Sequence, residues 1–587
     1  SLFTTRQLQL KGFESWVYWE RLTDRRPIGL QSTNRIHRML PLKQLARQSR
    51  ERTAWILRPT LPVGVRHHSQ RLGSADLPLW GQILTVVRGG NTEGISSYIH
   101  GDFVSSSSAN SHRDLVNPAT GARVCSFEIA SQEQVNESIS SSIDAQKTWS
   151  KISAAERAKV LIRTADILDS RNDEIARVEA FDTGRPLQET LVVDVKSATD
   201  CLRFTAGILQ GKCGQYVELS GPGDSNGSFC IVKREPLGVT AGIGAWNYPL
   251  QGCVWKAAPS LAAGNSMIFK PSEETPLTAL VLAQAFIEAG APKGLFNVIL
   301  GSGETGRQLC EHPEIKKVSF TGSLETGRLV AQSAGYGLKK MTLELGGKSP
   351  LIVFEDADLD AAVSAAMVGN WYSCGEVCSN ATRVFVNNSC KEAFLKLLAE
   401  RTRKLKIGDP LLMDTQIGPL ISRTQFDKVK EYVAVAREEG AKVICGGMEH
   451  TFHSDVGDLK NGYFFEPAII DHVEDTMTVA REEIFGPVMS LMGFDSEEEV
   501  VERANATPYG LAAGVYTSDL RRAHRMAALL QAGTVWINNY NLTPVEVPWG
   551  GHKASGVGFE NGNEAINQWT QPKTVYIEMG KIDSPYP

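Results

Sequence analysis

The sequence contains no uninterrupted apolar run of about 18 residues, the length that a membrane-spanning helix needs. It also has little excess charge, because 61 Lys and Arg residues stand against 66 Asp and Glu residues. We therefore predict no membrane segment and no nucleic-acid partner. Cysteine is scarce as well: ten occur in 587 residues without paired spacing, so we expect no disulfide framework. Such cysteines suit a reducing compartment, where a thiol stays free for chemistry.

Cys374 and Cys378 stand four residues apart and invite comparison with a metal site. A structural zinc ion normally takes four protein ligands, and no second Cys or His pair at a suitable spacing accompanies these two. The sequence therefore predicts no metal.

The N-terminal residues 1–94 differ from the rest of the chain and are predicted to form an extension. Within 39–70, one acid, Glu51, stands against six basic residues: Lys43, Arg47, Arg50, Arg52, Arg58 and Arg66. Arg-rich, acid-poor segments resemble mitochondrial presequences, which predicts a mitochondrial location. The alternative is translated upstream sequence or a disordered tail on a cytoplasmic protein.

The remaining length is enough for two or three domains, and its pattern is that of an α/β protein. Short apolar runs alternate with stretches of helical spacing, which predicts parallel sheets covered by helices on both faces. In one helical stretch, Thr275 is the predicted N-cap, Pro276 the first-turn residue and Gly290 the terminator. The predicted buried strands are 239–246, 266–270, 296–301 and 317–322, then 351–354, 510–517 and 533–539 in a second segment.

Chemistry-bearing residues fall at the ends of these strands, where parallel sheets bind their ligands. Cys378 follows a predicted helix, where N–H dipoles favour loss of the thiol proton, although a lone cysteine is more often a core residue. Glu344 ends an apolar strand, so it is either a general base or part of a salt bridge. Asn247 follows another strand and is either an oxyanion donor or an ordinary turn residue.

Two glycine patterns suggest phosphate binding. The segment 301–306 matches G-x-G-x-x-G after a strand and includes Gly303, but this pattern alone is weak. In 320–327, Gly322 and Ser323 precede a predicted helix, whose first N–H groups can hold a diphosphate.

Seven motifs, in this order and spacing, identify residues from about Tyr98 to the C-terminus as similar to the aldehyde dehydrogenase superfamily. They are AWNYP (245–249), FKPSEETP (269–276), FTGS (320–323), LELGGKSP (343–350), GEVC (375–378), EEIFGPV (482–488) and PWGGHKASG (548–556). The resemblance implies an NAD-binding domain of Rossmann type (95–216 and 238–346) and an α/β catalytic domain (347–565). It also implies a β-arm for oligomerisation (217–237 and 566–587), and hence a homotetramer or homodimer.

The resemblance also assigns roles to individual residues. It makes Cys378 the nucleophile and Glu344 the general base, with Asn247 in the oxyanion hole. Its other assignments concern the cofactor NAD, which is preferred over NADP because a glutamate at 273 repels a 2′-phosphate. The residues expected near the cofactor are Trp246, Lys270, Glu273, Gly303, Gly322, Ser323, Glu483 and Phe485.

Four aromatic residues fall where the family lines its aldehyde channel: Tyr248, Trp255, Tyr372 and Trp549. Tyr and Trp rings attract quaternary ammonium groups, so this set resembles enzymes for betaine aldehyde and 4-trimethylaminobutyraldehyde. The alternative is an apolar funnel for aliphatic or aromatic aldehydes. A more remote alternative is a non-enzymatic crystallin-like or scaffolding member, against which Cys378 and Glu344 argue. Glu376 stands where many relatives have Gln, and Phe559 where an Arg is usual.

Overall fold

The structure is a computed structural model. It describes Ile83, Val87, 94–105, 112–209, 211, 214–219, 227–452, 456–582 and 584–587, all within one compact unit, Ser74–Pro587. The presequence predicted within 39–70 lies outside the described residues. Among the helices that are described, none has the length and apolar character needed to cross a membrane.

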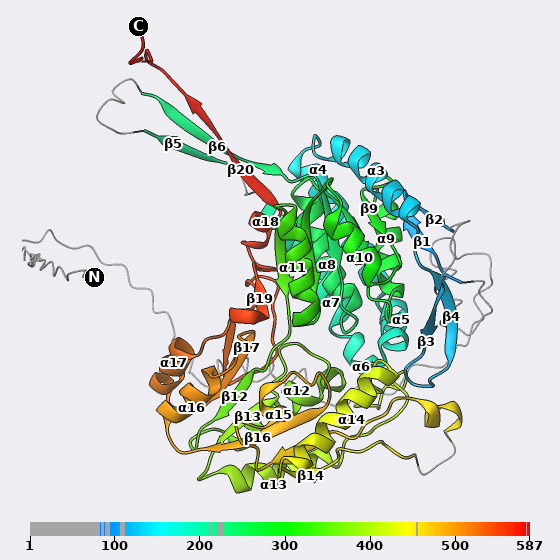
Figure 1. Ribbon diagram of the computed structural model, residues 1–587, viewed down its shortest axis with the longest axis vertical. Coiled ribbons are helices and arrows are strands. Elements are labelled where there is room, and N and C mark those ends of the chain that lie inside the picture. Colours follow the sequence, from blue (N-terminus) through cyan, green and yellow to red (C-terminus); the bar gives the residue numbers. More distant parts are fainter. Residues whose placement is uncertain are drawn as a thin grey trace, which may run out of the picture. The chain divides into compact units, whose positions relative to one another are not determined.

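An eight-stranded sheet forms the first half of the described fold (Figure 1). Its five central strands are parallel and, numbered along the chain, lie in the order 3-2-1-4-5 that is typical of doubly wound sheets. Ligands bind where this order reverses, here between the ends of β7 and β10. The five strands are β7 (Val239–Ile243), β8 (Ser266–Lys270), β9 (Phe296–Val298), β10 (Ile315–Thr321) and β11 (Lys340–Glu344). Antiparallel partners flank them: β1 (Ser97–Ile99), β2 (Asp102–Val104) and β19 (Gly556–Val557).

Helices cover both faces of this sheet because its strands are apolar on both sides. On one face, Val135, Leu309 and Val330 from three helices share a core with β7 and β10 residues. These helices are α3 (Gln132–Trp149), α10 (Gly303–Glu311) and α11 (Leu324–Tyr336). On the other face, Met267 and Phe269 join a larger core. Its helices are α4 (Ala154–Ser170), α5 (Asn172–Thr183), α7 (Asp194–Leu209), α8 (Pro249–Ala262) and α9 (Leu277–Glu288), while α6 (Leu187–Thr190) packs against α5 in a small separate cluster.

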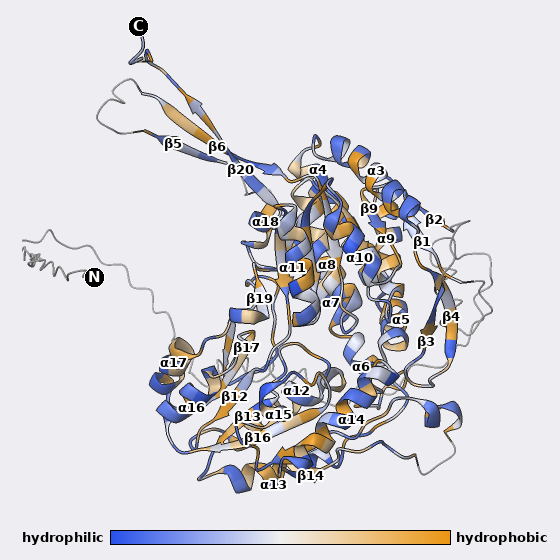
Figure 2. Ribbon diagram, in the orientation of Figure 1, coloured by the Kyte–Doolittle hydropathy of each residue, from blue (hydrophilic) through white to orange (hydrophobic). Residues whose placement is uncertain are grey.

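A seven-stranded sheet forms the second half, and its strands are parallel except for the edge strand β14. In sheet order the strands are β14 (Lys442–Cys445), β15 (Ala468–Asp471), β16 (Val488–Phe494), β13 (Arg383–Asn387), β12 (Pro350–Val353), β17 (Ala512–Tyr516) and β18 (Thr534–Ile537). The outer helices α16 and α17 are mainly hydrophilic, whereas the strands are hydrophobic (Figure 2). The helices of this half are α12 (Leu359–Trp371), α13 (Lys391–Thr402), α14 (Arg423–Glu438), α15 (Thr478–Arg481), α16 (Glu497–Asn505) and α17 (Leu520–Leu529).

Two small antiparallel sheets complete the described fold. One pairs β3 (His112–Val116) with β4 (Arg123–Glu128). In the other, β6 (Phe229–Pro236) lies between β5 (Gln215–Glu218) and β20 (Thr570–Ile577), and the three strands extend away from both larger sheets (Figure 1). The short helix α18 (Ala565–Gln568) precedes β20.

Most predicted boundaries agree with these elements, but one helix start differs. Helix α9 begins at Leu277 with Pro276 as its N-cap, so Thr275 is not the capping residue. The Thr275 hydroxyl instead donates to the carbonyl of Trp246 at 3.3 Å. Asp182 accepts from the Leu277 N–H at 3.1 Å and so satisfies a first-turn donor from outside the helix. Gly290 ends the helix with φ +92°, as predicted.

Candidate active site

A pocket of about 1010 Å³ lies at the switch point of the first sheet. Its walls combine residues that follow β7, β10 and β11 with residues that precede β13 and β16 of the second sheet. The two halves of the fold therefore share one pocket. The expected residues among those that line it are Trp246, Asn247, Tyr248, Trp255, Gly322, Ser323, Glu344, Cys378, Glu483, Phe485 and Trp549.

Cys378 reaches the pocket through a constrained turn. The 3-10 helix η1 (Tyr372–Gly375) follows α12 directly, and Ser373, Cys374 and Gly375 all have positive φ, between 50° and 78°. At Gly375 a β-carbon would lie 2.2 Å from the carbonyl carbon of Gly486, so only glycine fits there. The turn thus fixes the chain three residues before the thiol.

The electrostatics of Cys378 correct one expectation. Burial raises the pKa of its thiol well above the ordinary value, and the carboxyl groups of Glu344 and Glu483 act in the same direction. Backbone N–H groups of Cys378 and Ser379 lower the pKa, but they are outweighed. The N–H groups therefore act in the predicted direction, but burial and the two carboxyls raise the pKa overall, so the prediction of an easily ionised thiol is wrong.

Glu344 ends β11 and is only 4% exposed. Among the described residues, neither of its carboxyl oxygens has a hydrogen-bond partner and none forms an ion pair with it, so the salt-bridge alternative is not observed. Burial raises its pKa well above the usual range, and the Glu560 carboxyl adds to this. Lys256 and the Trp549 indole favour the ionised form more weakly. Glu344 is thus a buried carboxyl with a raised pKa that faces a pocket, a setting suited to proton exchange.

Lys256 and Glu560 form a buried ion pair beside Glu344. The Lys256 ammonium also donates to the Thr321 hydroxyl at 2.7 Å, and Glu560 lines the pocket. The sequence did not predict this pair. A signal for Lys256 was available, since it is the only charged residue in the apolar helix α8. Its partner lies 304 residues further along the chain, so no local pattern identifies it.

Asn247 is held so that its side-chain amide faces the pocket. One amide hydrogen is donated to the carbonyl of Glu376 at 2.9 Å, and the backbone carbonyl of Asn247 accepts from Arg185 at 3.3 Å. An amide carries two hydrogens, so the second remains for a ligand. Glu376, which replaces the more frequent Gln, accepts from the Ile421 N–H at 3.2 Å, and burial raises its pKa well above the usual range. A protonated Glu376 is a close substitute for the neutral amide.

Several expected cofactor residues lie together on the other side of the pocket. Ser323 caps the 13-residue helix α11, so the first N–H groups of this helix begin at Leu324, directly after the pocket-lining residues Gly322 and Ser323. The rings of Trp246 and Phe485 contact edge to face at 5.1 Å. Glu483 accepts from the N–H of Gly347 at 3.1 Å, and a β-carbon on Gly347 would lie 2.7 Å from the Cys378 carbonyl oxygen.

Two further cofactor-side residues come from α14 and were not predicted. Gln425 lines the pocket and donates to the carbonyls of Ile484 and Phe485, at 3.1 and 2.6 Å. It therefore holds the segment that carries Phe485, whose φ is +61°. Lys428 lines the pocket one turn later and lies within electrostatic reach of Glu483. Their spacing on a helix is a weak signal, because a Gln and a Lys on an exposed face are common.

Three expected cofactor residues lie outside the pocket lining. Lys270 and Glu273 form an ion pair at 3.4 Å beyond the carboxyl end of β8. Gly303 is the first residue of α10, and a β-carbon there would meet no atom within 4 Å. Close packing thus does not explain a glycine at 303. Lys270 lies beside Gly306 of the same helix, at 3.7 Å from where its β-carbon would be.

The four expected aromatic residues do not all meet. Tyr248, Trp255 and Trp549 line the pocket, whereas Tyr372 is not among the lining residues. Tyr248 donates or accepts a 2.8 Å hydrogen bond with Ser373, and the Arg185 guanidinium lies 4.0 Å from its ring centroid. Phe559, the unusual replacement for Arg, is 37% exposed and also lies outside the lining.

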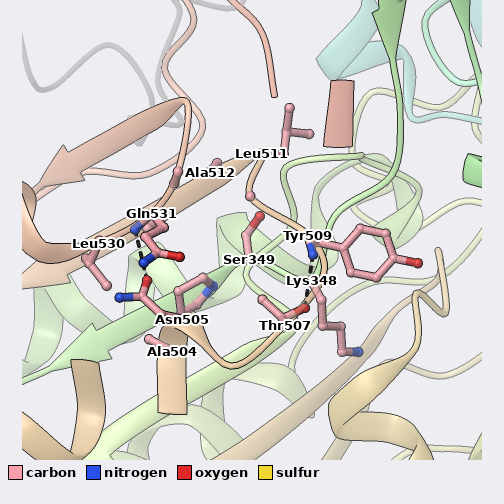
Figure 3. Close-up of a pocket in the computed structure, with 14 residues that line it drawn as sticks. Lys348, Ser349, Ala504, Asn505, Thr507, Tyr509, Leu511, Ala512, Leu530 and Gln531 are labelled. Atoms are coloured by element: carbon pink, nitrogen blue, oxygen red, sulfur yellow. Dashed lines mark hydrogen bonds between the residues drawn. The ribbon is translucent and has the colours of Figure 1, made fainter. Parts of the chain in front are cut away.

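A second, smaller cavity of about 240 Å³ lies at the amino-terminal ends of β12 and β17 (Figure 3). Its lining includes Lys348, Ser349, Thr507 and Tyr509. The backbone N–H of Tyr509 donates to the Thr507 hydroxyl at 3.3 Å. The Lys348 ammonium is buried and has no hydrogen-bond partner among the described residues. Burial lowers its pKa to about 7, and Arg383 adds to this. Within the same described part of the chain, no group of three or more His, Cys, Asp or Glu residues is placed to hold a metal ion.

Comparison with known proteins gives the class. The model of the aldehyde dehydrogenase family matches residues 103–575. Betaine aldehyde dehydrogenases from Brucella anthropi and Brucella ovis are each 51% identical over 491 residues, which is 84% of this chain and 99% of theirs. The chain therefore belongs to the aldehyde dehydrogenase family.

Solved structures agree. A betaine aldehyde dehydrogenase from Staphylococcus aureus in complex with NAD⁺ is 35% identical, with a TM-score of 0.81 over 87% of this chain and 99% of that one. An aldehyde dehydrogenase from Bacillus cereus in complex with NAD⁺ is 37% identical, with a TM-score of 0.79 over 83% and 97%.

Proposed function

We propose that this protein oxidises an aldehyde to a carboxylic acid with NAD, and that its preferred aldehydes carry a trimethylammonium group. The observation that carries the reaction is the meeting of Cys378, Glu344 and Asn247 in one pocket, with no partner on either oxygen of Glu344 among the described residues. The related enzymes named above act, by their names, on betaine aldehyde, and two of the solved relatives contain NAD⁺.

The residues present fit NAD. The N-terminus of α11 at Ser323 offers free N–H groups and a positive dipole end to a diphosphate. Glu483 and Phe485 would hold the nicotinamide ribose and ring, and Lys270 with Glu273 the adenosine ribose. When bound, NAD accepts the hydride, and the positive charge of its ring lowers the pKa of a nearby thiol.

The chain's own residues supply the remaining steps. The Cys378 thiol releases its proton to solvent, its sulfur attacks the aldehyde carbon, and the free amide hydrogen of Asn247 with the Cys378 N–H holds the resulting oxyanion. Loss of hydride from this thiohemiacetal leaves a thioester on Cys378. Glu344 acts in its ionised form: it removes a proton from water, the water attacks the thioester carbon, and the acid leaves as the sulfur regains its charge or a proton.

The aromatic side chains support the cationic substrate class. Three indole or phenol rings line the pocket, and each face attracts a quaternary ammonium by about 0.5–2 kcal/mol when water is excluded. With Tyr372 outside the lining, the proposal rests on Tyr248, Trp255 and Trp549.

The test is NADH formation with betaine aldehyde, 4-trimethylaminobutyraldehyde and hexanal at matched concentrations. A higher kcat/KM for the two cationic aldehydes supports the narrow function. Preference for hexanal would leave a broad-specificity aldehyde dehydrogenase with an apolar channel, and absence of NADH with every aldehyde would favour a non-enzymatic member.

We also propose that the protein forms a homotetramer or homodimer through β5, β6 and β20. These strands leave sheet edges open and expose apolar side chains, among them Tyr216, which is 61% exposed, and Val217. Sedimentation analysis of Tyr216→Glu is expected to show smaller species than the unaltered protein. A mitochondrial location rests on the composition of residues 39–70 alone, and an import assay with residues 1–94 fused to a reporter tests it against a cytoplasmic location.

A further inference from the structure

Behind the pocket wall lies a buried polar cluster that the reaction does not use. Its members are Glu189 from α6, Asp194 from α7, Arg185 before α6, and Ser373 from η1. All four are buried, and Tyr248 connects them to the pocket through its hydroxyl. The cluster matters because it places charge directly behind a ring that faces the proposed substrate.

The charges in this cluster do not balance. Arg185 forms two hydrogen bonds with the Asp194 carboxylate, at 2.6 and 2.9 Å, and both side chains are almost fully buried. The positive charge of the Arg185 guanidinium is thus paired with the negative charge of the Asp194 carboxylate. Glu189 forms no ion pair with any residue in the described part of the chain, although it is only 7% exposed. A buried carboxylate without its own counter-ion is costly, so it favours any cation that can approach.

A hydrogen-bond chain links Glu189 to the pocket. One Glu189 oxygen accepts from the Ser373 N–H at 3.0 Å and from its hydroxyl at 3.2 Å. The Ser373 oxygen in turn lies 2.8 Å from the Tyr248 hydroxyl and 3.0 Å from Arg185 Nε. When Glu189 is ionised, the Ser373 hydroxyl donates its single hydrogen to the carboxylate. The Tyr248 hydroxyl must then donate to the Ser373 oxygen. Donation makes the phenol ring more electron-rich, which strengthens its attraction for a cation.

We propose that Glu189 is a specificity-determining residue: its carboxylate supplies the unmatched negative charge, relayed through Ser373 and Tyr248, that selects a cationic aldehyde. The inference rests on the proposed function and explains why an apolar channel alone would not discriminate. The missing counter-ion of Glu189 is then the trimethylammonium group of the substrate.

Burial raises the pKa of Glu189 to about 8, whereas Arg185 and the bonds from Ser373 oppose the rise. The charged and titratable groups that face it are Arg185, Asp194, Tyr248, Tyr372 and Cys374. Without substrate, Glu189 is therefore mostly neutral at pH 7 and ionised at pH 9. The preference for a cation should rise as pH passes through 8.

The experiment compares betaine aldehyde with 3,3-dimethylbutanal, in which carbon replaces the charged nitrogen and the shape is unchanged. We expect the ratio of their kcat/KM values to rise by about tenfold from pH 6.5 to pH 9 in the unaltered protein, in line with one added charge nearby. In Glu189→Gln the ratio should stay at its low-pH value throughout. Glu189→Asp, which keeps the charge, should retain the rise, as should Glu137→Gln, which removes an exposed charge on α3.

The outcomes separate the two proposals. Hydration of each aldehyde in water changes the kcat/KM ratio by the same factor for every variant. It therefore cancels when this ratio is compared between variants. If the unaltered protein prefers the cationic aldehyde but Glu189→Gln keeps the full ratio at every pH, the role of Glu189 is overturned and the proposed function stands. If both rates fall alike in Glu189→Gln, the residue is merely structural. A flat pH profile of the ratio in the unaltered protein refutes the inference without any variant, and a ratio near one at every pH refutes the cationic substrate itself.

Discussion

Replacement of Glu344 by Gln separates the two halves of the proposed reaction. The carboxyl is 4% exposed with no hydrogen-bond partner among the described residues, so the change keeps the volume and removes the proton acceptor. Attack by Cys378 and loss of hydride do not need this acceptor, whereas hydrolysis of the thioester does. A positioned general base contributes about 10²–10⁴-fold, so hydrolysis should slow by that factor.

The same change should stabilise the protein. The pKa of Glu344 is raised in the folded state, so the unfolded chain releases this proton at a lower pH than the folded one does. Between the two pKa values, stability therefore falls as pH rises. Gln cannot ionise, so the variant escapes this loss and should have a higher Tm than the unaltered protein at pH 7.

Stopped-flow measurement of NADH checks the prediction. Glu344→Gln should give a burst of about one NADH per active site, followed by a slow steady rate, and mass spectrometry should find the acyl group on Cys378. The matched control is Glu560→Gln, which alters the neighbouring carboxyl in the Lys256 pair and leaves the proposed base in place. A burst rate that falls as far as the steady rate, with no acyl-enzyme, would show that Glu344 acts before the thioester and would refute the assignment.

Three other changes test different parts of the site. Cys378→Ala should abolish turnover and leave NAD binding, measured by fluorescence titration; retained dehydrogenase activity would exclude this thiol as nucleophile. Trp549→Ala should raise KM for trimethylammonium aldehydes more than for hexanal, and an equal loss for both would remove the cation–π argument. Lys348→Met should have a larger free energy of unfolding than the unaltered protein. This difference should be about 2 kcal/mol greater at pH 7 than at pH 9, because the folded ammonium titrates near pH 7. A gap in Tm that does not narrow with pH would contradict it.

The sign for Lys348 follows from its lowered pKa. Between about pH 7 and its ordinary value of 10.5, the unfolded chain holds a proton that the folded chain has lost. Stability of the unaltered protein therefore rises with pH across this window, and Met removes the dependence. Lys317→Met is the matched control, since burial lowers that pKa to about 7 as well, but Lys317 donates to Thr342 and faces Trp569. Because Lys317→Met loses those contacts, it should gain less stability than Lys348→Met.

The sequence alone determined most elements of the fold and singled out the residues proposed to react. Apolar runs and helix signals are local, so strands such as β7, β8 and β10 were predicted close to their observed bounds. The family motifs are local as well: they placed Glu344 and Asn247 at strand ends and Cys378 after a helix, and the structure brings the three into one pocket. Local chemistry is enough for such predictions because backbone propensity and side-chain type act over a few residues.

Only the tertiary structure decided the environment of those groups. The Lys256 and Glu560 pair joins positions 304 residues apart, and Glu189 meets Ser373 across 184 residues, so neither contact has a local signal. The same long-range packing leaves Cys378 half-buried and raises the pKa of its thiol, opposite to the predicted direction. It also places Tyr372 outside the pocket lining although its neighbours in sequence belong to the active-site turn. Charge and burial depend on everything that surrounds a group in space, which the order of residues along the chain does not specify.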